Sequence, residues 1–332
     1  MPSDEGTEKS VSWHRKLEES EARTKRGHSV SKYEVVIIGG GPAGLTAGLY
    51  ASRAGLRSLL LEKGIPGGQI VNARQVENYP GFSEGISGAE LGQFMHRQAA
   101  KYGLETVPIE ATRVSTGHLY EVSTPQGNIQ TESIIIATGS EYRKLGVNGE
   151  KRLSGRGVSY CATCDGFFFR DRQVAVVGGG DTAITDALEL SQHANKVYVI
   201  HRRDQLRATK ALQERVSSQP KIELVWDTVV AEIVGDNMLT NLNLRNVKTG
   251  QSSNLEVDGL FVAVGLKPNS HIFSHLVTVD EAGFIMTDEL MRTSTPGIFA
   301  AGDIRHNSFR QAITAAGDGA AAASSAFTYL YQ

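Results

Sequence analysis

Two cysteines lie two residues apart in "CATCDG", residues 161–166, and the 332-residue chain contains no others. A single C-x-x-C in a chain without further cysteines is typical of a redox-active thiol pair. Two cysteines cannot build a disulfide framework, and they cannot close a four-ligand zinc site without help from His or Asp. We therefore interpret Cys161 and Cys164 as a redox pair and assign no metal site.

An acidic residue, Asp165, directly follows the second cysteine. Its carboxyl group could return or remove the proton that a leaving thiolate needs. Asp165 and Gly166 also form a common turn dipeptide, and the residues alone allow this structural interpretation equally well.

A glycine-rich turn follows the apolar run at residues 33–38, and a helix is expected from about Pro42. The next apolar run, 57–61, ends at Glu62, 18 residues after the last glycine of the turn. This order predicts a βαβ dinucleotide-binding unit, in which the helix N-terminus faces a pyrophosphate and the acid accepts from a ribose hydroxyl. The glycines, with G-x-G-x-x-G spacing, are Gly39, Gly41 and Gly44.

The same pattern returns later, between expected strands at 173–177 and 196–200. Here Gly178 and Gly180 form the turn, and Ala183 takes the third glycine position. No acid stands where Glu62 stands in the first copy. The second strand is instead followed by basic residues that could hold a 2′-phosphate: His201, Arg202, Arg203 and Arg207. The alternative is that these are ordinary solvated charges. The two turns thus predict FAD or NAD at the first site and NADP(H) at the second.

Two further segments favour FAD at the first site. Residues 133–140, "SIIIATGS", predict a buried strand ending in a turn, and a second strand ends at Gly302 and Asp303. A helix rich in Ala, Gly and Ser is expected from about Gln311. Asp303 could hold a ribityl hydroxyl, and the positive end of this helix could face the flavin pyrimidine.

The order of these segments predicts an α/β fold with two Rossmann-like dinucleotide-binding domains, one inserted into the other. The FAD-binding domain is expected at 33–145 and 274–332. The NADPH-binding domain, which carries the C-x-x-C, is expected at 146–273. Residues 1–32 form a polar N-terminal extension, which we expect to be flexible.

Composition argues against several classes of protein. Lys plus Arg number 34 and Asp plus Glu number 36, so no charge excess indicates nucleic acid or a membrane surface as partner. No apolar run approaches the length of a membrane span, and the extension lacks the apolar core of a signal peptide. We expect a cytoplasmic protein.

From residue 33 to its end the chain resembles bacterial-type, low-molecular-weight thioredoxin reductase. The resemblance lies in "GGGPAGL", "GGQI" with "VENYPGF", "CATCDGFFF", "HRRDQLRA" and "AGDI" with "RQAI". It implies an FAD-containing homodimer that uses NADPH to reduce the disulfide of thioredoxin. It also assigns Cys164 to the flavin side and Cys161 to the attack on thioredoxin, with Asp165 as the acid/base. The extension has no counterpart in the compact form of this family.

Carried over by position, the resemblance gives two sets of cofactor-binding residues. Those for FAD are Gly39, Gly41, Pro42, Ala43, Gly44, Glu62, Lys63, Gly68, Gln69, Asn78, Ala137, Thr138, Gly139, Gly302, Asp303, Arg310, Gln311 and Ala312. Those for NADPH are Gly178, Gly180, Asp181, Thr182, Ala183, His201, Arg202, Arg203 and Arg207.

Two other functions stay open at this point. The chain could be a related flavin disulfide reductase that serves a different thioredoxin-like carrier. It could also be a non-catalytic redox sensor or metal-binding module, although two intact nucleotide-binding turns argue against that.

Overall fold

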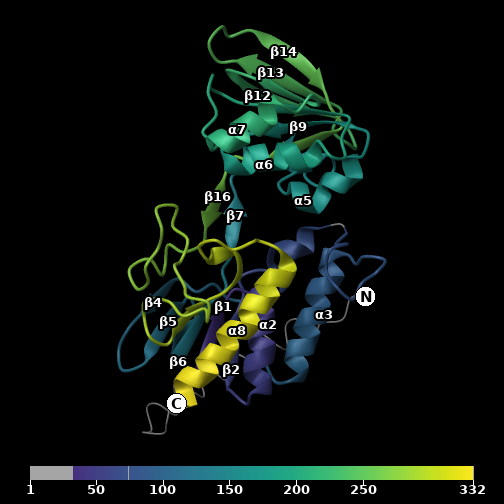
Figure 1. Ribbon diagram of the computed structural model, residues 1–332. Coiled ribbons are helices and arrows are strands. Elements are labelled where there is room, and N and C mark those ends of the chain that lie inside the picture. The colour runs from purple at the N-terminus through teal and green to yellow at the C-terminus, as the bar shows by residue number, and fades with distance from the viewer. Residues whose placement is uncertain (1–32, 74, 332) are drawn as a thin grey trace. The chain divides into compact units, whose positions relative to one another are not determined.

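The computed structural model describes residues 33–73 and 75–331, which form two compact units (Figure 1). Within those residues, the first unit extends to Gly68, resumes over Gly92–Gly139 and resumes again from Ser270. The second unit comprises Gln69–Leu91 and Ser140–Asn269. Segments of the first unit thus lie on both sides of Ser140–Asn269 in the sequence. From the sequence, the two domain boundaries are expected near residues 145 and 273. The N-terminal extension, residues 1–32, lies outside the described residues.

A sheet of seven described strands forms the centre of the first unit, in the order β3-β2-β1-β6-β5-β4, with β17 paired to β6. The strands are β1 (Tyr33–Ile38), β2 (Ser58–Leu61), β3 (Glu105–Val107), β4 (Arg113–Ser115), β5 (Tyr120–Thr124), β6 (Gly127–Ile136) and β17 (Ile298–Ala300). The pairs of β1 with β2 and β6, of β2 with β3 and of β17 with β6 are parallel. The helices are α2 (Pro42–Arg53), α3 (Gly88–Lys101) and α8 (Ala312–Tyr331), with 3-10 turns η1 (Gly68–Asn72) and η3 (Gly302–Ile304).

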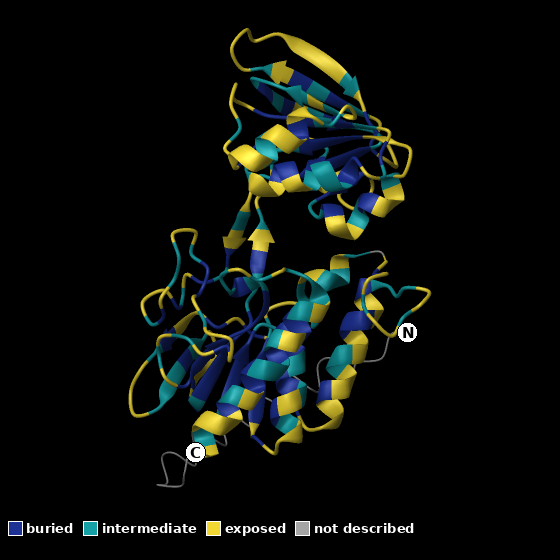
Figure 2. Cartoon of the chain, in the orientation of Figure 1, coloured by how far each residue is buried: buried dark blue, intermediate teal, exposed yellow. Residues whose placement is uncertain are grey.

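The four apolar residues that end β1, 35–38, are buried because both faces of the sheet are covered (Figure 2). Val35 and Ile37 pack in the core that includes helices α2 and α8. Val36 and Ile38 pack in the opposite core, with Phe273 and other residues of the C-terminal segment. The predicted strand at 33–38 and the helix from Pro42 are both confirmed.

The second unit is built on a parallel sheet in the order β11-β10-β9-β15-β8. Its strands are β8 (Val158–Ser159), β9 (Gln173–Val177), β10 (Lys196–Ile200), β11 (Ile222–Val225) and β15 (Gly259–Val262). An antiparallel sheet adds β12 (Thr228–Val234), β13 (Asn241–Asn246) and β14 (Ser252–Glu256), and a ribbon pairs β7 (Ser140–Tyr142) with β16 (Leu266–Pro268). The helices are α4 (Glu150–Leu153), α5 (Ala162–Asp165), α6 (Asp181–Leu190) and α7 (Lys210–Ser217), with the 3-10 turn η2 (Gly166–Phe169). The strands predicted at 173–177 and 196–200 are confirmed.

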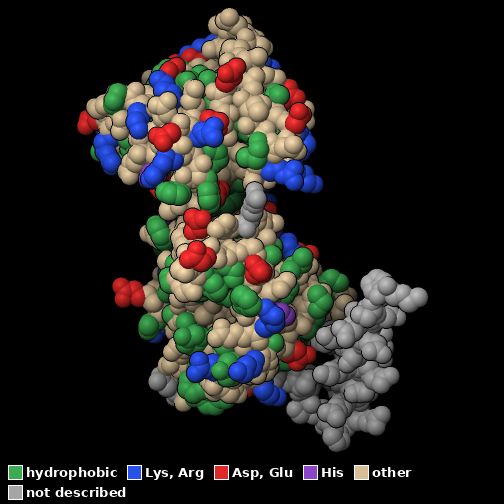
Figure 3. Space-filling model, turned by 90° about the vertical axis from the view of Figure 1, so that its right-hand side faces the viewer, with side chains coloured by type: hydrophobic (Ala, Val, Ile, Leu, Met, Phe, Trp, Pro, Cys, Tyr) green, Lys and Arg blue, Asp and Glu red, His purple; other side chains and the backbone are tan. Residues whose placement is uncertain are grey.

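Both units carry mixed charge on the surface. Figure 3 shows Lys and Arg side chains interspersed with Asp and Glu over the viewed face, in keeping with the formal net charge of −2. Across the part of the chain that the structure describes, no helix is both long enough and apolar enough to cross a membrane.

Close contact between the backbones of α2 and α8 explains the small residues of α8. A Cβ atom added at Gly319 would lie 2.1 Å from the carbonyl oxygen of Ala43 and 3.0 Å from the amide nitrogen of Ala47. Helix α8 also contains Gly317, at which an added Cβ would meet no atom within 4 Å. Only one of these two glycines is therefore required by packing.

We expect Gly319→Ala to lower the free energy of unfolding by about 1–3 kcal/mol, because the methyl group forces two helix backbones apart. The matched control, Gly317→Ala, should be neutral or stabilising by up to about 1 kcal/mol, since alanine is the better helix former. Urea unfolding followed by circular dichroism measures both. Equal stability of the two variants would contradict the packing argument.

Candidate functional site

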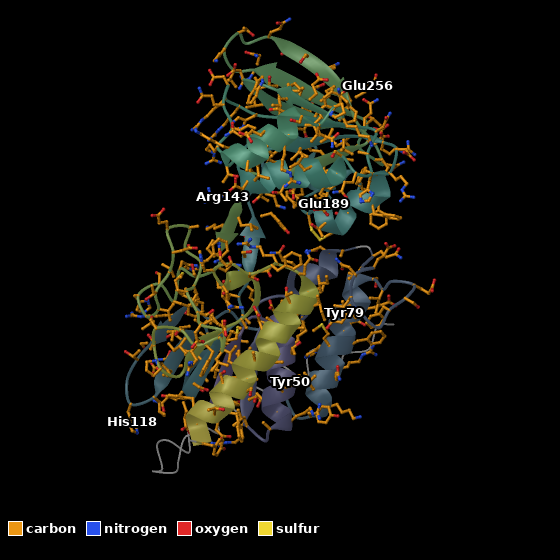
Figure 4. The ribbon with its side chains drawn as sticks, viewed as in Figure 1. Tyr50, Tyr79, His118, Arg143, Glu189 and Glu256 are labelled. Atoms are coloured by element: carbon orange, nitrogen blue, oxygen red, sulfur yellow. A yellow bond between two sulfur atoms is a disulfide. The ribbon has the colours of Figure 1, made fainter. Side chains whose placement is uncertain are left out.

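The two cysteines form a disulfide, with their Cα atoms 5.3 Å apart. Figure 4 draws it as a yellow bond close to the labelled Glu189, whose carboxylate accepts from the Thr163 hydroxyl at 3.0 Å. Cys161 is half-buried and stands at the N-terminal cap of α5, whereas Cys164 is exposed. The Cys164 amide donates to Cys161 Sγ at 3.1 Å. This contact would stabilise negative charge on Cys161 after reduction, because a backbone N–H favours the thiolate.

Asp165 is held by a serine that the sequence analysis did not single out. The Ser159 hydroxyl donates to Asp165 Oδ2 at 2.5 Å and accepts from the Cys161 amide at 3.1 Å. Burial raises the pKa of Asp165, and the hydrogen bond from Ser159 opposes that rise. The available signal was a serine at the end of a buried strand two residues before a cysteine, which is too common a pattern to indicate a role.

The first glycine turn is closed on one side and open on the other. Gly39 has a φ of +104°, and a Cβ added at Gly44 would lie 1.8 Å from the Gly39 carbonyl oxygen. A Cβ added at Gly41 would meet no atom nearer than 4.0 Å. No side chain caps α2, so its first turn faces this opening with backbone N–H groups. The turn therefore fits a pyrophosphate, which needs close backbone approach and N–H donors.

Glu62 stands at the end of β2, as expected, and its carboxylate holds the turn. Oε2 accepts from the Gly40 amide at 2.6 Å and Oε1 accepts from the Gly64 amide at 2.7 Å. Each carboxylate oxygen has a second lone pair, so Glu62 can also accept from a ribose hydroxyl. The neighbouring Lys63 pairs with Glu110 at 3.4 Å on the exposed surface.

The second glycine turn repeats this arrangement. A Cβ added at Gly178 would lie 2.5 Å from the Ala263 carbonyl oxygen and 2.6 Å from Ala183 Cβ. At Gly180, in contrast, the nearest atom is Arg207 Nη2 at 3.9 Å. Helix α6 begins here without a side-chain cap. The same physical criteria that fit the first turn to a pyrophosphate fit the second.

The basic segment after β10 is fixed by backbone hydrogen bonds. The Gly179 carbonyl oxygen accepts from the Arg207 amide at 2.7 Å and from the Ala208 amide at 3.2 Å. The Arg203 carbonyl accepts from the Asp227 amide at 3.2 Å. The side chains of Arg202, Arg203 and Arg207 are exposed, so this loop presents three guanidinium groups next to the turn.

Two other residues of the expected NADPH set have structural partners. His201 is buried, and a Cβ added at Gly179 would lie 2.3 Å from its ring. Its Nε2 lies 3.0 Å from the Gln205 carbonyl oxygen, and burial lowers its pKa. The Asp181 carboxylate accepts from the Thr209 amide at 2.7 Å, at the start of α7. Thr182 is exposed beside it in the first turn of α6.

The C-terminal segment places Asp303 in the 3-10 turn after β17. Burial raises its pKa to about 6, which the Arg310 charge opposes and the Asp318 charge reinforces. Arg310 adopts a left-handed φ of +56°, and its guanidinium lies 4.8 Å from the centroid of the Phe284 ring. Asp318, absent from the expected set, accepts from the Gly302 amide at 3.0 Å and pairs with Arg305 at 2.5 Å.

The remaining expected FAD residues fall in both units. Ala137, Thr138 and Gly139 follow β6 in the first unit, where a Cβ at Gly39 would lie 2.4 Å from the Ala137 carbonyl oxygen. Gln311 directly precedes α8, and Ala312 is the first residue of that helix. Gln69 and Asn78 group with the second unit, in which the Gln69 amide donates to the Ser140 carbonyl oxygen.

A family model described as "Pyridine nucleotide-disulphide oxidoreductase" matches residues 33–319. A thioredoxin reductase of Streptomyces coelicolor is 48% identical over 300 residues, which cover 89% of this chain and 93% of that protein. The thioredoxin reductase of Bacillus subtilis is 46% identical, with 90% and 95% covered. The crystal structure of thioredoxin reductase from Streptococcus pyogenes has a TM-score of 0.87 at 46% identity, covering 91% of this chain and 99% of that one. With its reducible cysteine pair and two dinucleotide-type turns, the chain belongs to the pyridine nucleotide-disulphide oxidoreductase family.

Proposed function

We propose that this protein is an NADPH-dependent thioredoxin-disulfide reductase, in which electrons pass from NADPH through FAD to the Cys161–Cys164 disulfide. The observation that carries the proposal is the pairing, in one compact unit, of a disulfide with a glycine turn flanked by three exposed arginines. The thioredoxin reductases that the chain resembles support thioredoxin as the carrier.

The first unit is proposed to bind FAD. The turn at Gly39–Gly44 would hold the pyrophosphate, Glu62 the adenosine ribose and Asp303 a ribityl hydroxyl. The second unit is proposed to bind NADPH, with its pyrophosphate at Gly178–Gly180 and its 2′-phosphate on the arginines. Bound FAD would supply the two-electron carrier between nicotinamide and disulfide.

The thiol–disulfide cycle at the two cysteines has three steps. Two electrons and two protons open the Cys161–Cys164 bond and give two thiols. The Cys161 thiolate then attacks the thioredoxin disulfide, forming a mixed disulfide and releasing one thioredoxin thiolate, which takes a proton. Finally, the Cys164 thiolate attacks Cys161 Sγ, re-forming the original bond and releasing the second thioredoxin thiol.

The division of labour between the cysteines has local support. Cys161 Sγ accepts the Cys164 amide hydrogen bond, which favours its thiolate and hence its role as the attacking nucleophile. Asp165 is the proposed proton carrier for the thiolates. We also infer a homodimer and a cytoplasmic location, by resemblance to the family.

The arginine loop should determine preference for NADPH over NADH. Charge-assisted hydrogen bonds contribute about 1.5–3 kcal/mol each, so Arg202→Ala or Arg203→Ala should raise KM for NADPH by roughly 10- to 150-fold. KM for NADH should change little, because NADH has no 2′-phosphate. Arg245→Ala removes an exposed arginine on the antiparallel sheet and serves as the control. Equal losses with both nucleotides would remove the specificity assignment.

The cysteine roles can be separated with two serine variants. Both variants should lose thioredoxin turnover almost completely, because serine oxygen cannot form the disulfide. A thioredoxin carrying a single cysteine, activated as a mixed disulfide with thionitrobenzoate, should form a stable covalent complex with reduced Cys164→Ser. Reduced Cys161→Ser should form little, and non-reducing electrophoresis distinguishes the two. A complex formed by the opposite variant would exchange the roles, and turnover by either variant would contradict the relay.

A further inference from the structure

Ser159 touches both functional parts of the redox segment. It is the last residue of β8 and is 6% exposed. Its hydroxyl donates to Asp165 Oδ2 at 2.5 Å and accepts from the Cys161 amide at 3.1 Å. The Cys161 carbonyl oxygen lies 3.3 Å from Ser159 Oγ and is a second acceptor for the serine hydroxyl. One buried side chain thus joins the carboxyl group to the backbone of the first cysteine.

A hydroxyl can donate one hydrogen bond and accept two. These bonds can be satisfied at Ser159 whether the Asp165 carboxyl is ionised or protonated. When Asp165 is ionised, Ser159 donates to it and accepts from the Cys161 amide. When Asp165 is protonated, its O–H donates to Ser159 Oγ, and the serine O–H turns to the Cys161 carbonyl. Neither state leaves a buried polar group unpaired, which would otherwise cost about 1–3 kcal/mol.

We propose that Ser159 is a positioning residue whose rotating hydroxyl satisfies Asp165 both with and without its proton, so that the carboxyl can give up and take back a proton during the thiol–disulfide cycle. The proposal rests on the proposed function, because that cycle defines the need for a proton carrier. The proton leaves Asp165 for a thiolate, returns when a thiol ionises, and involves no added oxidant or reductant.

Tyr160, between Ser159 and Cys161, donates its hydroxyl to Glu150 Oε1 at 2.9 Å. Further ionisable groups around this segment lie on neighbouring elements. Helix α6 contributes Glu189, which binds Thr163, and Asp186, whose pKa is raised to about 7 by burial and by the charge of Glu189. His193 meets the ring of Phe167 in η2 edge-on. Burial raises the pKa of Asp165, and the hydrogen bond from Ser159 opposes that rise.

The proposal predicts the titration of Asp165 in three variants. In Ser159→Ala, the protonated carboxyl should persist to higher pH than in the natural chain, because the bond that favours the carboxylate is lost. Ser159→Thr keeps a hydroxyl and should restore the natural titration. Ser191→Ala removes another buried hydroxyl of the same unit, one that donates to the Leu188 carbonyl, and should leave the titration unchanged.

Infrared spectroscopy of the oxidised holoenzyme measures this titration through the C=O stretching band of protonated carboxyls. Subtracting the spectrum of Asp165→Asn assigns the band to Asp165, and Asp186→Asn removes the raised carboxyl of helix α6 from the comparison. An unchanged titration in Ser159→Ala would overturn the proposal. So would an Asp165 band in the natural chain at the frequency of a carboxyl without a hydrogen bond, a result that needs no serine variant to fold.

Turnover with thioredoxin gives a second readout. In Ser159→Ala, kcat at neutral pH should fall by about tenfold or more while KM for NADPH stays unchanged. The alkaline limb of the pH profile of kcat should move to higher pH, together with the titration of the Asp165 carboxyl. If Ser159 were purely structural, the substitution would lower kcat without moving the alkaline limb of the pH profile. That result would contradict the proposal. If the infrared shift occurs but the natural chain does not reduce thioredoxin, the assignment of the carrier fails and the coupling of Ser159 to Asp165 stands.

Discussion

Both units depend on the same steric constraint: where a buried strand meets the following helix there is no room for a side chain, although the turns stay open at Gly41 and Gly180. At the first turn, a Cβ on Gly44 would lie 1.8 Å from the Gly39 carbonyl. At the second, a Cβ on Gly178 would lie 2.6 Å from Ala183 Cβ in the following helix. The strand and helix can approach only because these atoms are missing, and that approach brings an uncapped helix N-terminus to the end of the sheet.

From this shared frame the two units diverge at the end of the second βαβ strand. Glu62 holds its turn through two backbone amides, and a carboxylate at that position would repel a 2′-phosphate. The second unit has arginines there, and Asp204, the acid in that loop, is paired with Lys248 at 2.9 Å. The redox disulfide belongs to this second unit, in a short helix between β8 and β9. The two units thus share a βαβ fold but differ in the charge that follows its second strand, and the redox centre belongs to the second unit alone among the described residues.

Sequence reasoning located the elements whose signals are local. Residues 35–38 are apolar because both faces of β1 are buried there, and glycine spacing marks the turn that follows. The partners that depend on the folded chain were not predictable. Ser159 reaches Asp165 only because β8 ends beside α5, and Asp318 reaches the Gly302 amide only because α8 returns to β17. The burial of His201 against Gly179 likewise depends on how β10 packs in the folded chain. The sequence of the basic segment alone does not distinguish this buried histidine from the exposed arginines that follow it.

We propose that one continuous two-electron relay joins NADPH to the thioredoxin disulfide through FAD and the cysteine pair. An anaerobic titration of the purified holoenzyme, followed by visible absorbance, tests it most directly. NADPH should bleach the yellow colour, and oxidised thioredoxin should then restore it in proportion to the disulfide added. Bleaching by NADPH without recovery on addition of oxidised thioredoxin would show that the cysteine pair does not pass electrons to thioredoxin.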